Sequence, residues 1–193
     1  MPEPALLAGP EDLARHVGEL GAAISADHPD GVTLVGVLKG SVIFVSDLSR
    51  RLTVPTRLEF LAVAPYDGAA GRTRVVKDLD NPVDGEHVVL VTGIVDTGLT
   101  ADFLLRHLRA AGPASVQVCA LADKRARRIL PLAIDYAAIE APDAFLLGYG
   151  LDYAGRYRNL RGLWAADGAA LADDPDRYVE QLHLAGRGRG SGR

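Results

Sequence analysis

One segment, residues 88–100, limits the folds open to this chain more than any other. It opens with four apolar residues, Val-Val-Leu-Val, a run typical of a strand that is buried on both faces. A short loop containing Asp96 and Gly98 follows, and Thr100 is placed to cap a helix over residues 101–111. A buried strand that leads through a loop into a helix is typical of α/β proteins. Such a loop also gathers backbone N–H groups where a phosphate can bind.

Strands and helices alternate along the rest of the chain. Apolar runs predict further strands over residues 32–38, 57–64, 74–79, 115–121, 134–139 and 145–149. Helical spacing and cap signals predict further helices over residues 11–27 and 41–52. We therefore expect an α/β fold with a mainly parallel central sheet flanked by helices. Residues 1–10 predict a loose arm, and residues 65–73, with two glycines and few apolar residues, predict a mobile loop.

Length and composition indicate one soluble globular domain. A chain of 193 residues is long enough for a sizeable core, and we place the domain at residues 1–186. The formal net charge of −4 disfavours a dedicated nucleic-acid binder. Residues 187–193, rich in Arg and Gly, predict a disordered tail, with weak contact to RNA as the alternative.

The single cysteine and the apolar segments indicate the compartment. Cys119 lies in an apolar run, so we expect a buried, reduced thiol and a cytoplasmic protein. No early stretch reads as a signal peptide, and no apolar segment is long enough to span a bilayer. We therefore expect no contact with a membrane.

Two strand-to-helix turns carry groups suited to phosphate. In the loop after residues 88–95, Gly98 allows close approach of backbone to an anion, and the hydroxyls of Thr97 and Thr100 can donate to it. An ordinary βα turn is the alternative. The turn that follows residues 32–38 carries Lys39 and Gly40, which in isolation read as a surface turn. Because open α/β sheets bind ligands at one edge, the two turns together predict a clamp for two phosphate groups.

Two later segments add polar and aromatic groups. A basic run follows residues 115–121, and Lys124 is its cation nearest the strand end, so we expect it to point into a site. Arg125 and Arg127 are expected to be solvated. Phe145 alone reads as a core residue, and Asp152 alone reads as a loop carboxylate.

Taken in order, these segments resemble the hypoxanthine-guanine phosphoribosyltransferases, which act on 6-oxopurines. The resemblance is carried by residues 36–41, 88–100, 123–124 and 145–158, and it extends from about residue 32 to residue 164. It implies the type I phosphoribosyltransferase fold, with a small hood and a mobile lid loop over the central sheet. It also implies an enzyme that transfers 5-phosphoribosyl from 5-phosphoribosyl diphosphate (PRPP) to N9 of hypoxanthine or guanine, releasing pyrophosphate.

The resemblance also implies roles for individual residues. Asp96 matches the general base that takes the proton from purine N7. Four residues match the cradle of the 5′-phosphate: Thr97, Gly98, Leu99 and Thr100. Four others match groups at the pyrophosphate: Lys39, Gly40, Arg128 and Arg158. The peptide bond before Lys39 is often cis in this family.

Purine, metal and lid residues follow from the same resemblance. Lys124 matches the donor to purine O6, Phe145 the ring stacked on the purine, and Leu146 a backbone contact to the base. Asp152 matches a ligand of Mg²⁺, the implied cofactor, and Tyr66 matches the aromatic residue of the lid. Family members usually form oligomers, so we expect a homodimer or a homotetramer.

One departure from the family pattern concerns the ribose. Two adjacent carboxylates that meet the ribose hydroxyls in the family are replaced here by Thr92 and Gly93. The absence of a side chain on Gly93 predicts open space at that position. Two alternatives to ordinary salvage activity follow. One is a paralogue with an altered sugar donor or base, in the synthesis of purine-nucleoside natural products, and the other is a non-catalytic regulator that senses a nucleotide.

Overall fold

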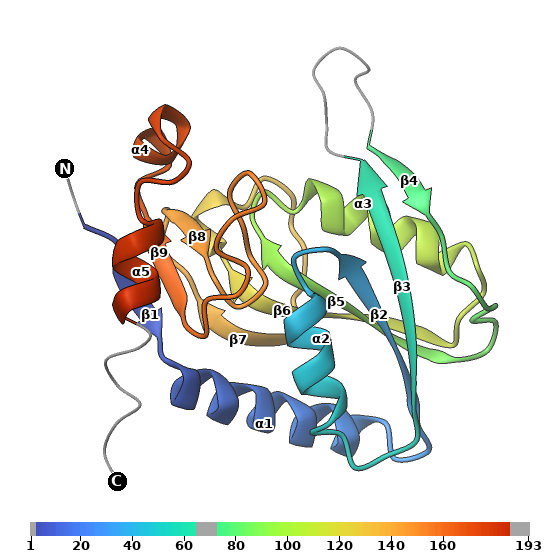
Figure 1. Ribbon diagram of the computed structural model, residues 1–193. Coiled ribbons are helices and arrows are strands. Elements are labelled where there is room, and N and C mark those ends of the chain that lie inside the picture. Colours follow the sequence, from blue (N-terminus) through green and yellow to red (C-terminus); the bar gives the residue numbers. More distant parts are fainter. Residues whose placement is uncertain (1–2, 65–72, 186–193) are drawn as a thin grey trace, which may run out of the picture.

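The computed structural model describes residues 3–64 and 73–185. Its centre is a six-stranded sheet in the order β4-β3-β2-β5-β6-β7, in which β4 alone runs antiparallel to its neighbour (Figure 1). The strands of this sheet are β2 (Val32–Leu38), β3 (Thr56–Ala64), β4 (Arg74–Lys77), β5 (His87–Val95), β6 (Ser115–Asp123) and β7 (Tyr136–Glu140). The predicted α/β fold with a mainly parallel sheet is therefore confirmed.

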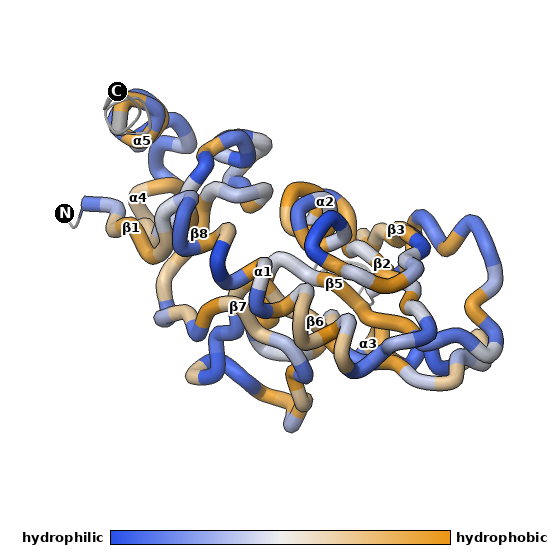
Figure 2. The backbone as a smooth tube through the Cα atoms, turned by 90° about the horizontal axis from the view of Figure 1, so that it is seen from below, coloured by the Kyte–Doolittle hydropathy of each residue, from blue (hydrophilic) through white to orange (hydrophobic). Residues whose placement is uncertain are grey.

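Helices cover both faces of this sheet. Helices α1 (Pro10–Asp27) and α2 (Val42–Ser49) pack on one face, and α3 (Leu99–Arg109) packs on the other. Side chains of β5 alternate between the two faces, as the pleat requires: Val89 faces α1 and α2, whereas Val88 and Leu90 face α3. Figure 2 shows the apolar colour concentrated along the central strands and hydrophilic colour in many of the surrounding loops.

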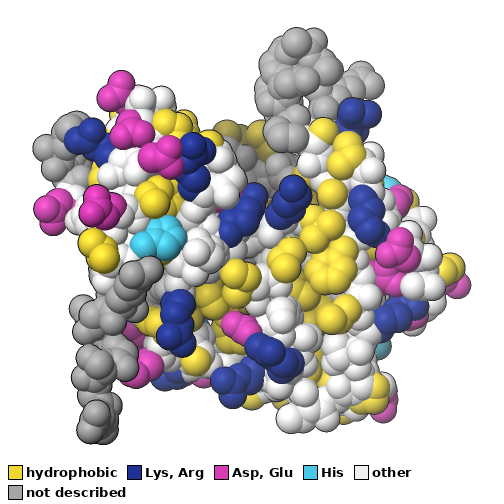
Figure 3. Space-filling view, viewed as in Figure 1, with side chains coloured by type: hydrophobic (Ala, Val, Ile, Leu, Met, Phe, Trp, Pro, Cys, Tyr) yellow, Lys and Arg dark blue, Asp and Glu magenta, His cyan; other side chains and the backbone are white. Residues whose placement is uncertain are grey.

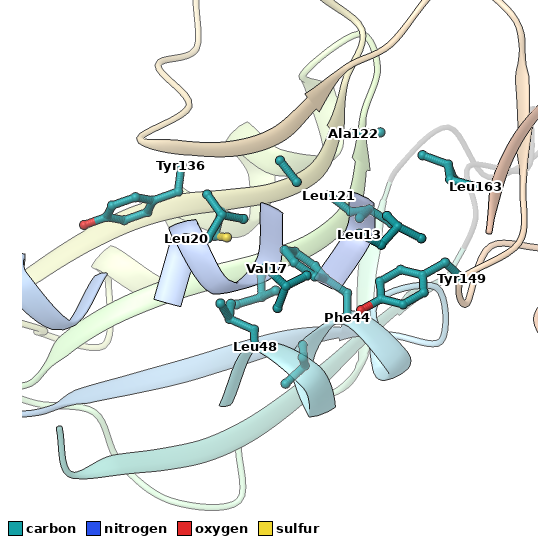
Figure 4. Close-up of a cluster of buried hydrophobic side chains, with 14 of the residues drawn as sticks. Leu13, Val17, Leu20, Phe44, Leu48, Leu121, Ala122, Tyr136, Tyr149 and Leu163 are labelled. Carbon is teal, nitrogen blue, oxygen red and sulfur yellow. The ribbon is translucent and has the colours of Figure 1, made fainter. Parts of the chain in front are cut away.

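The largest core cluster lies between the sheet and the two N-terminal helices. Leu13 and Val17 of α1 meet Phe44 of α2 at the centre of this cluster, and all three are almost fully buried (Figure 4). Cys119 also belongs to it, and burial raises the pKa of its thiol well above the usual range. The buried thiol predicted from the sequence is confirmed.

A second, smaller sheet stands beside the first. Its antiparallel strands follow the order β1-β9-β8 and span β1 (Ala5–Ala8), β9 (Leu163–Ala166) and β8 (Phe145–Leu147). Helices α4 (Gly168–Asp173) and α5 (Val179–Ala185) pack on its side of the molecule in a separate apolar cluster. This sheet corresponds to the expected hood. The predicted loose N-terminal arm is wrong, because residues 5–8 pair with β9 and place the Ala8 side chain in the core.

The bounds of α3 and α2 differ from the sequence prediction by more than one residue. Helix α3 begins at Leu99, and its N-cap is Gly98 with a φ of 89°. Thr100 is thus inside the first turn, and the prediction that it caps the helix is wrong. Helix α2 ends at Ser49 instead of extending to residue 52, because residues 50–53 turn back toward β3.

The carboxyl ends of the parallel strands form one edge of the large sheet. The chain leaves β2 toward β3 on one side and leaves β5 toward β6 on the other, so β2 and β5 flank the point where the winding reverses. Ligands of open α/β proteins bind at such a point. Among the helices of residues 3–64 and 73–185, none is long and apolar enough to cross a membrane.

Candidate active site

The loop between β5 and α3 encloses a small cavity. The positive φ of Gly98 turns the backbone tightly, and the Thr97 hydroxyl accepts a hydrogen bond from the Leu99 N–H at 3.4 Å. A cavity of about 100 Å³ lies against this loop, with Thr92, Asp96, Thr97, Gly98 and Thr100 among its lining residues. The amino end of α3 borders this cavity, which is a setting that favours a phosphate. Of the four residues predicted to cradle a phosphate, Thr97, Gly98 and Thr100 line this cavity, whereas the Leu99 side chain is exposed.

The turn after β2 lies against the end of β5. The peptide bond between Leu38 and Lys39 is cis, as the resemblance implied. The Ser41 hydroxyl donates to the Val37 carbonyl at 2.7 Å and closes the turn. The Gly40 carbonyl oxygen lies 3.2 Å from the position that a Cβ would take on Gly93. The Lys39 turn and the end of β5 are therefore in contact.

A second cavity, of about 570 Å³, opens on the other side of Asp96. Its lining residues come from five separate parts of the chain and include Asp96, Lys124, Asp143, Phe145 and Asp167. Lys124 is buried, and its backbone N–H donates to the Val95 carbonyl at 3.0 Å, which fixes it beside the end of β5. Its Nζ lies 4.0 Å from Asp96 Oδ2, too far for a hydrogen bond but close enough for an ion pair.

Phe145 forms an aromatic wall of this larger cavity. It is the first residue of β8, it pairs with Ala166 of β9, and its ring meets Tyr153 edge to face at a centroid distance of 5.3 Å. Leu146 is buried in the core, so any ligand contact it makes must use its backbone. Phe145 therefore lines the cavity, and its stacking on a purine stays a prediction.

Arg127 is exposed, as predicted, but it also lines the larger cavity. Its Nε donates to Asp96 Oδ1 at 2.6 Å, and its Nη1 donates to Asp143 Oδ1 at 3.1 Å. These two carboxylates raise the pKa of the Arg127 guanidinium above its usual range. Its neighbour Arg125 is exposed, as predicted, although it pairs with Asp123 and Glu140. The sequence did not predict that Arg127 contacts Asp96. Arg125 and Arg127 stand in one basic run, and no periodicity in that run separates one arginine from the other.

Arg128 lies beside the small cavity. Its Cδ is 3.0 Å from the position that a Cβ would take on Gly98, and its guanidinium pairs with the buried carboxylate of Asp123. Its Nε and Nη1 are buried without a hydrogen-bond partner among the described residues. The structure thus places Arg128 next to the loop of Thr97 and Gly98, and a role at pyrophosphate stays a prediction.

Asp152 and Arg158 form an ion pair near the Lys39 turn. Arg158 Nη2 lies 2.8 Å from Asp152 Oδ1, and Arg158 Nη1 donates to the Gly150 carbonyl at 2.7 Å. The second oxygen of Asp152 accepts the Gly155 N–H at 2.8 Å. Gly150 in turn approaches Gly40, whose carbonyl oxygen is 2.6 Å from the Cβ position of Gly150. Asp152 and Arg158 are therefore joined through Gly150 to the turn that carries Lys39.

Thr92 and Gly93 occupy the floor between the two turns. The Thr92 hydroxyl donates to the Ile94 carbonyl at 3.3 Å, within its own strand. The prediction of open space at Gly93 is wrong, because Leu151 Cδ2 lies 2.7 Å from its Cβ position. Tyr66, predicted in the lid, and the tail at residues 187–193 lie outside the described residues.

Comparison with known proteins agrees with this geometry. Residues 7–154 match the model of the phosphoribosyl transferase domain family. The hypoxanthine-guanine phosphoribosyltransferase of Mycobacterium avium is 40% identical over 159 residues, covering 81% of this chain and 78% of its own. The chain belongs to the hypoxanthine-guanine phosphoribosyltransferase family. It is accordingly a phosphoribosyltransferase, with the type I fold predicted from the sequence.

Other members of the family show the same likeness. The hypoxanthine-guanine phosphoribosyltransferase of Bacillus subtilis is 36% identical over 159 residues, covering 80% of this chain and 88% of its own. The hypoxanthine phosphoribosyltransferase of Trypanosoma cruzi, solved in complex with its product IMP, superposes with a TM-score of 0.80 at 35% identity. That comparison covers 85% of this chain and 94% of the other.

Proposed function

We propose that this phosphoribosyltransferase transfers 5-phosphoribosyl from PRPP to N9 of hypoxanthine or guanine and releases pyrophosphate. The observation that carries the proposal is the position of Asp96, which lines both the small cavity and the larger one. The small cavity, at the amino end of α3, suits the 5′-phosphate. The larger cavity has an aromatic wall and a buried lysine, which suit a purine that carries a carbonyl group.

The reaction follows from this arrangement. The loop of Thr97 and Gly98 holds the 5′-phosphate, and the turn of Lys39 and Gly40 holds the diphosphate. The bond from C1′ to the diphosphate oxygen breaks, and the diphosphate leaves with the electron pair. N9 then forms the new bond to C1′, and Asp96 takes the proton from N7. Positioning and electrostatic stabilisation contribute most of the catalysis in such a displacement.

Lys124 gives the site its preference among purines. Its ammonium group donates only, so it suits the carbonyl oxygen at C6 of hypoxanthine or guanine. The amino group of adenine would leave this donor unpaired, and such a mismatch in a buried site is strongly selective. The site should therefore reject adenine.

We further propose that Mg²⁺ binds together with the diphosphate. Among the described residues no three carboxylate, histidine or cysteine side chains converge on a metal site. Mg²⁺ is usually bound by one or two carboxylates, and water and substrate phosphates complete its coordination shell. The single carboxylate of Asp152 is therefore enough for such a site. Asp152 would hold the ion next to Arg158, and the ion would offset the charge of the departing diphosphate.

The alternatives are not favoured. The identified relatives are hypoxanthine and hypoxanthine-guanine phosphoribosyltransferases, and the proposed base Asp96 lines both cavities. A regulator without activity would have no need of a carboxylate that faces both cavities. We keep the predictions of a homodimer or homotetramer and of a cytoplasmic location as parts of this proposal.

The decisive experiment supplies PRPP, Mg²⁺ and one purine at a time, and follows nucleotide and pyrophosphate by chromatography. We expect IMP from hypoxanthine or GMP from guanine, in equal amounts with pyrophosphate, and no AMP from adenine. Binding of PRPP and purine without any nucleotide would contradict the proposal and would favour the regulator.

A further inference from the structure

We propose that Arg127 is a positioning residue for Asp96: it holds one oxygen of this carboxylate so that the other serves as the proton acceptor. This inference rests on the proposed function, in which Asp96 is the base. The sequence indicated no function for Arg127 and predicted only that its side chain is solvated.

The two oxygens of Asp96 have different environments. Oδ1 accepts a hydrogen bond from Arg127 Nε at 2.6 Å, whereas Oδ2 lies 4.0 Å from Lys124 Nζ. The hydrogen bond from the Arg127 guanidinium is short and charge-assisted, and it fixes the orientation of the carboxylate. Oδ2 is thus the oxygen left to accept a proton from the substrate, beside the lysine that would bind O6.

The backbone explains why Lys124 and Arg127 serve the same carboxylate. Residues Arg125–Arg127 form a single 3₁₀ turn, and the Arg127 N–H donates to the Lys124 carbonyl at 3.0 Å. Side chains three residues apart in such a turn eclipse one another. Arg127 and Lys124 therefore point to the same side, whereas Arg125 points away toward Asp123 and Glu140.

Asp143 holds the outer end of Arg127. It accepts from Arg127 Nη1 at 3.1 Å, and it stands two residues before Phe145 in the wall of the larger cavity. The guanidinium is therefore held at both ends, by the proposed base and by the segment that carries the aromatic wall. Besides Asp96, the charged groups that line the larger cavity are Lys124, Arg127, Asp143, Asp167 and Glu3.

Stability does not account for this arrangement. The side chains of Arg127, Asp96 and Asp143 keep exposed fractions of 43%, 40% and 61%. Ion pairs as exposed as these contribute little to folding. Replacing Arg127 should therefore leave the fold intact, which makes its effect on the reaction measurable.

The test compares four single variants and one double variant with the wild type in the reaction of PRPP with hypoxanthine. We expect Arg127→Ala to lower kcat about tenfold while the KM of PRPP stays within about twofold, since a misplaced base affects the proton transfer. Arg127→Lys should recover part of the kcat. Arg125→Ala, which removes the same charge from the same turn, should leave kcat unchanged. Asp143→Ala should lower kcat in the wild-type background and have no further effect in Arg127→Ala, because it acts through Arg127.

A second readout does not need turnover. The carboxyl carbon of Asp96, followed by ¹³C NMR at one pH, should shift in Arg127→Ala and stay in place in Arg125→Ala. An active wild type together with an unchanged kcat in Arg127→Ala would overturn the inference. An inactive wild type would overturn the proposed function and with it the positioning role of Arg127 in the reaction, even if the carboxyl signal shifts as expected.

Discussion

Leu151 Cδ2 lies 2.7 Å from the position that a Cβ would take on Gly93, so the leucine occupies the space that the sequence predicted to be open. Leu151 is itself buried, and it directly precedes Asp152, which we propose as the Mg²⁺ ligand. The surface between the two turns that we propose to bind phosphate is therefore apolar at position 93. Figure 3 shows basic side chains along the middle of this face of the molecule, between the small sheet and α2.

This contact predicts the effect of introducing a side chain at position 93. Gly93→Asp forces Leu151 Cδ2 to move and presses on the Gly40 carbonyl, 3.2 Å away. Overpacking of this kind destabilises a protein by about 1–3 kcal/mol. Urea unfolding measures this loss of stability. In the Leu151→Ala background, Gly93→Asp should cost less stability than it does in the wild type, because the side chain that it displaces is absent. Equal stabilities of wild type and Gly93→Asp would mean that the leucine moves freely.

Position 92 offers a cleaner test of the missing carboxylates. Thr92 is partly buried and lines the small cavity, so Thr92→Glu brings a carboxylate toward the sugar without the contact found at Gly93. A hydrogen bond to a charged group contributes about 1.5–3 kcal/mol, so we expect the KM of PRPP to fall about tenfold. Thr92→Gln is the uncharged control, and it should give a smaller change. Equal KM values for all three proteins would show that position 92 does not face the ribose.

Asp96 should be essential for turnover and dispensable for binding. We expect Asp96→Asn to lower kcat by about a hundredfold or more, the usual contribution of a general base, because an amide cannot take the N7 proton. The affinity for IMP, measured by calorimetry, should change far less. A kcat close to that of the wild type would remove Asp96 from the role of base.

Lys124 should determine the choice of purine. Lys124→Met removes the donor to O6 while keeping a long apolar side chain, so the KM of hypoxanthine should rise about tenfold to a hundredfold. The preference for hypoxanthine over adenine should fall in the same variant, as measured by the ratio of kcat/KM values. An unchanged ratio would show that another group reads position 6 of the purine.

The sequence predicted those parts of the fold that local patterns determine. The apolar run of β2 and the helical spacing of α1 each predicted an element whose bounds agree with the structure within one residue. Strand β1 was missed because it is short and gains its stability from β9, at the far end of the chain. The Gly98 N-cap of α3 was missed because its left-handed backbone is a property of the folded loop.

The residues of the candidate site also differ in how far the sequence alone could predict them. The phosphate loop, the Lys39 turn and Lys124 were predicted from their places at the ends of predicted strands, whereas the role of Phe145 was predicted from the resemblance to the family. Arg127 was not, because its role depends on Asp96 and Asp143, which approach it only in the folded chain. The filling of position 93 depends on Leu151 in the same way. Contacts between distant segments are what the sequence could not supply.

The most direct test of the account is a crystal structure of this enzyme with bound IMP. We predict the phosphate of IMP in the small cavity beside Thr97 and Gly98, and the purine in the larger cavity between Lys124 and Phe145, with N7 facing Asp96. The central claim is that Asp96 lies between the phosphate site and the purine site. A nucleotide bound with its base away from Lys124, or with its phosphate away from the loop between β5 and α3, would contradict it.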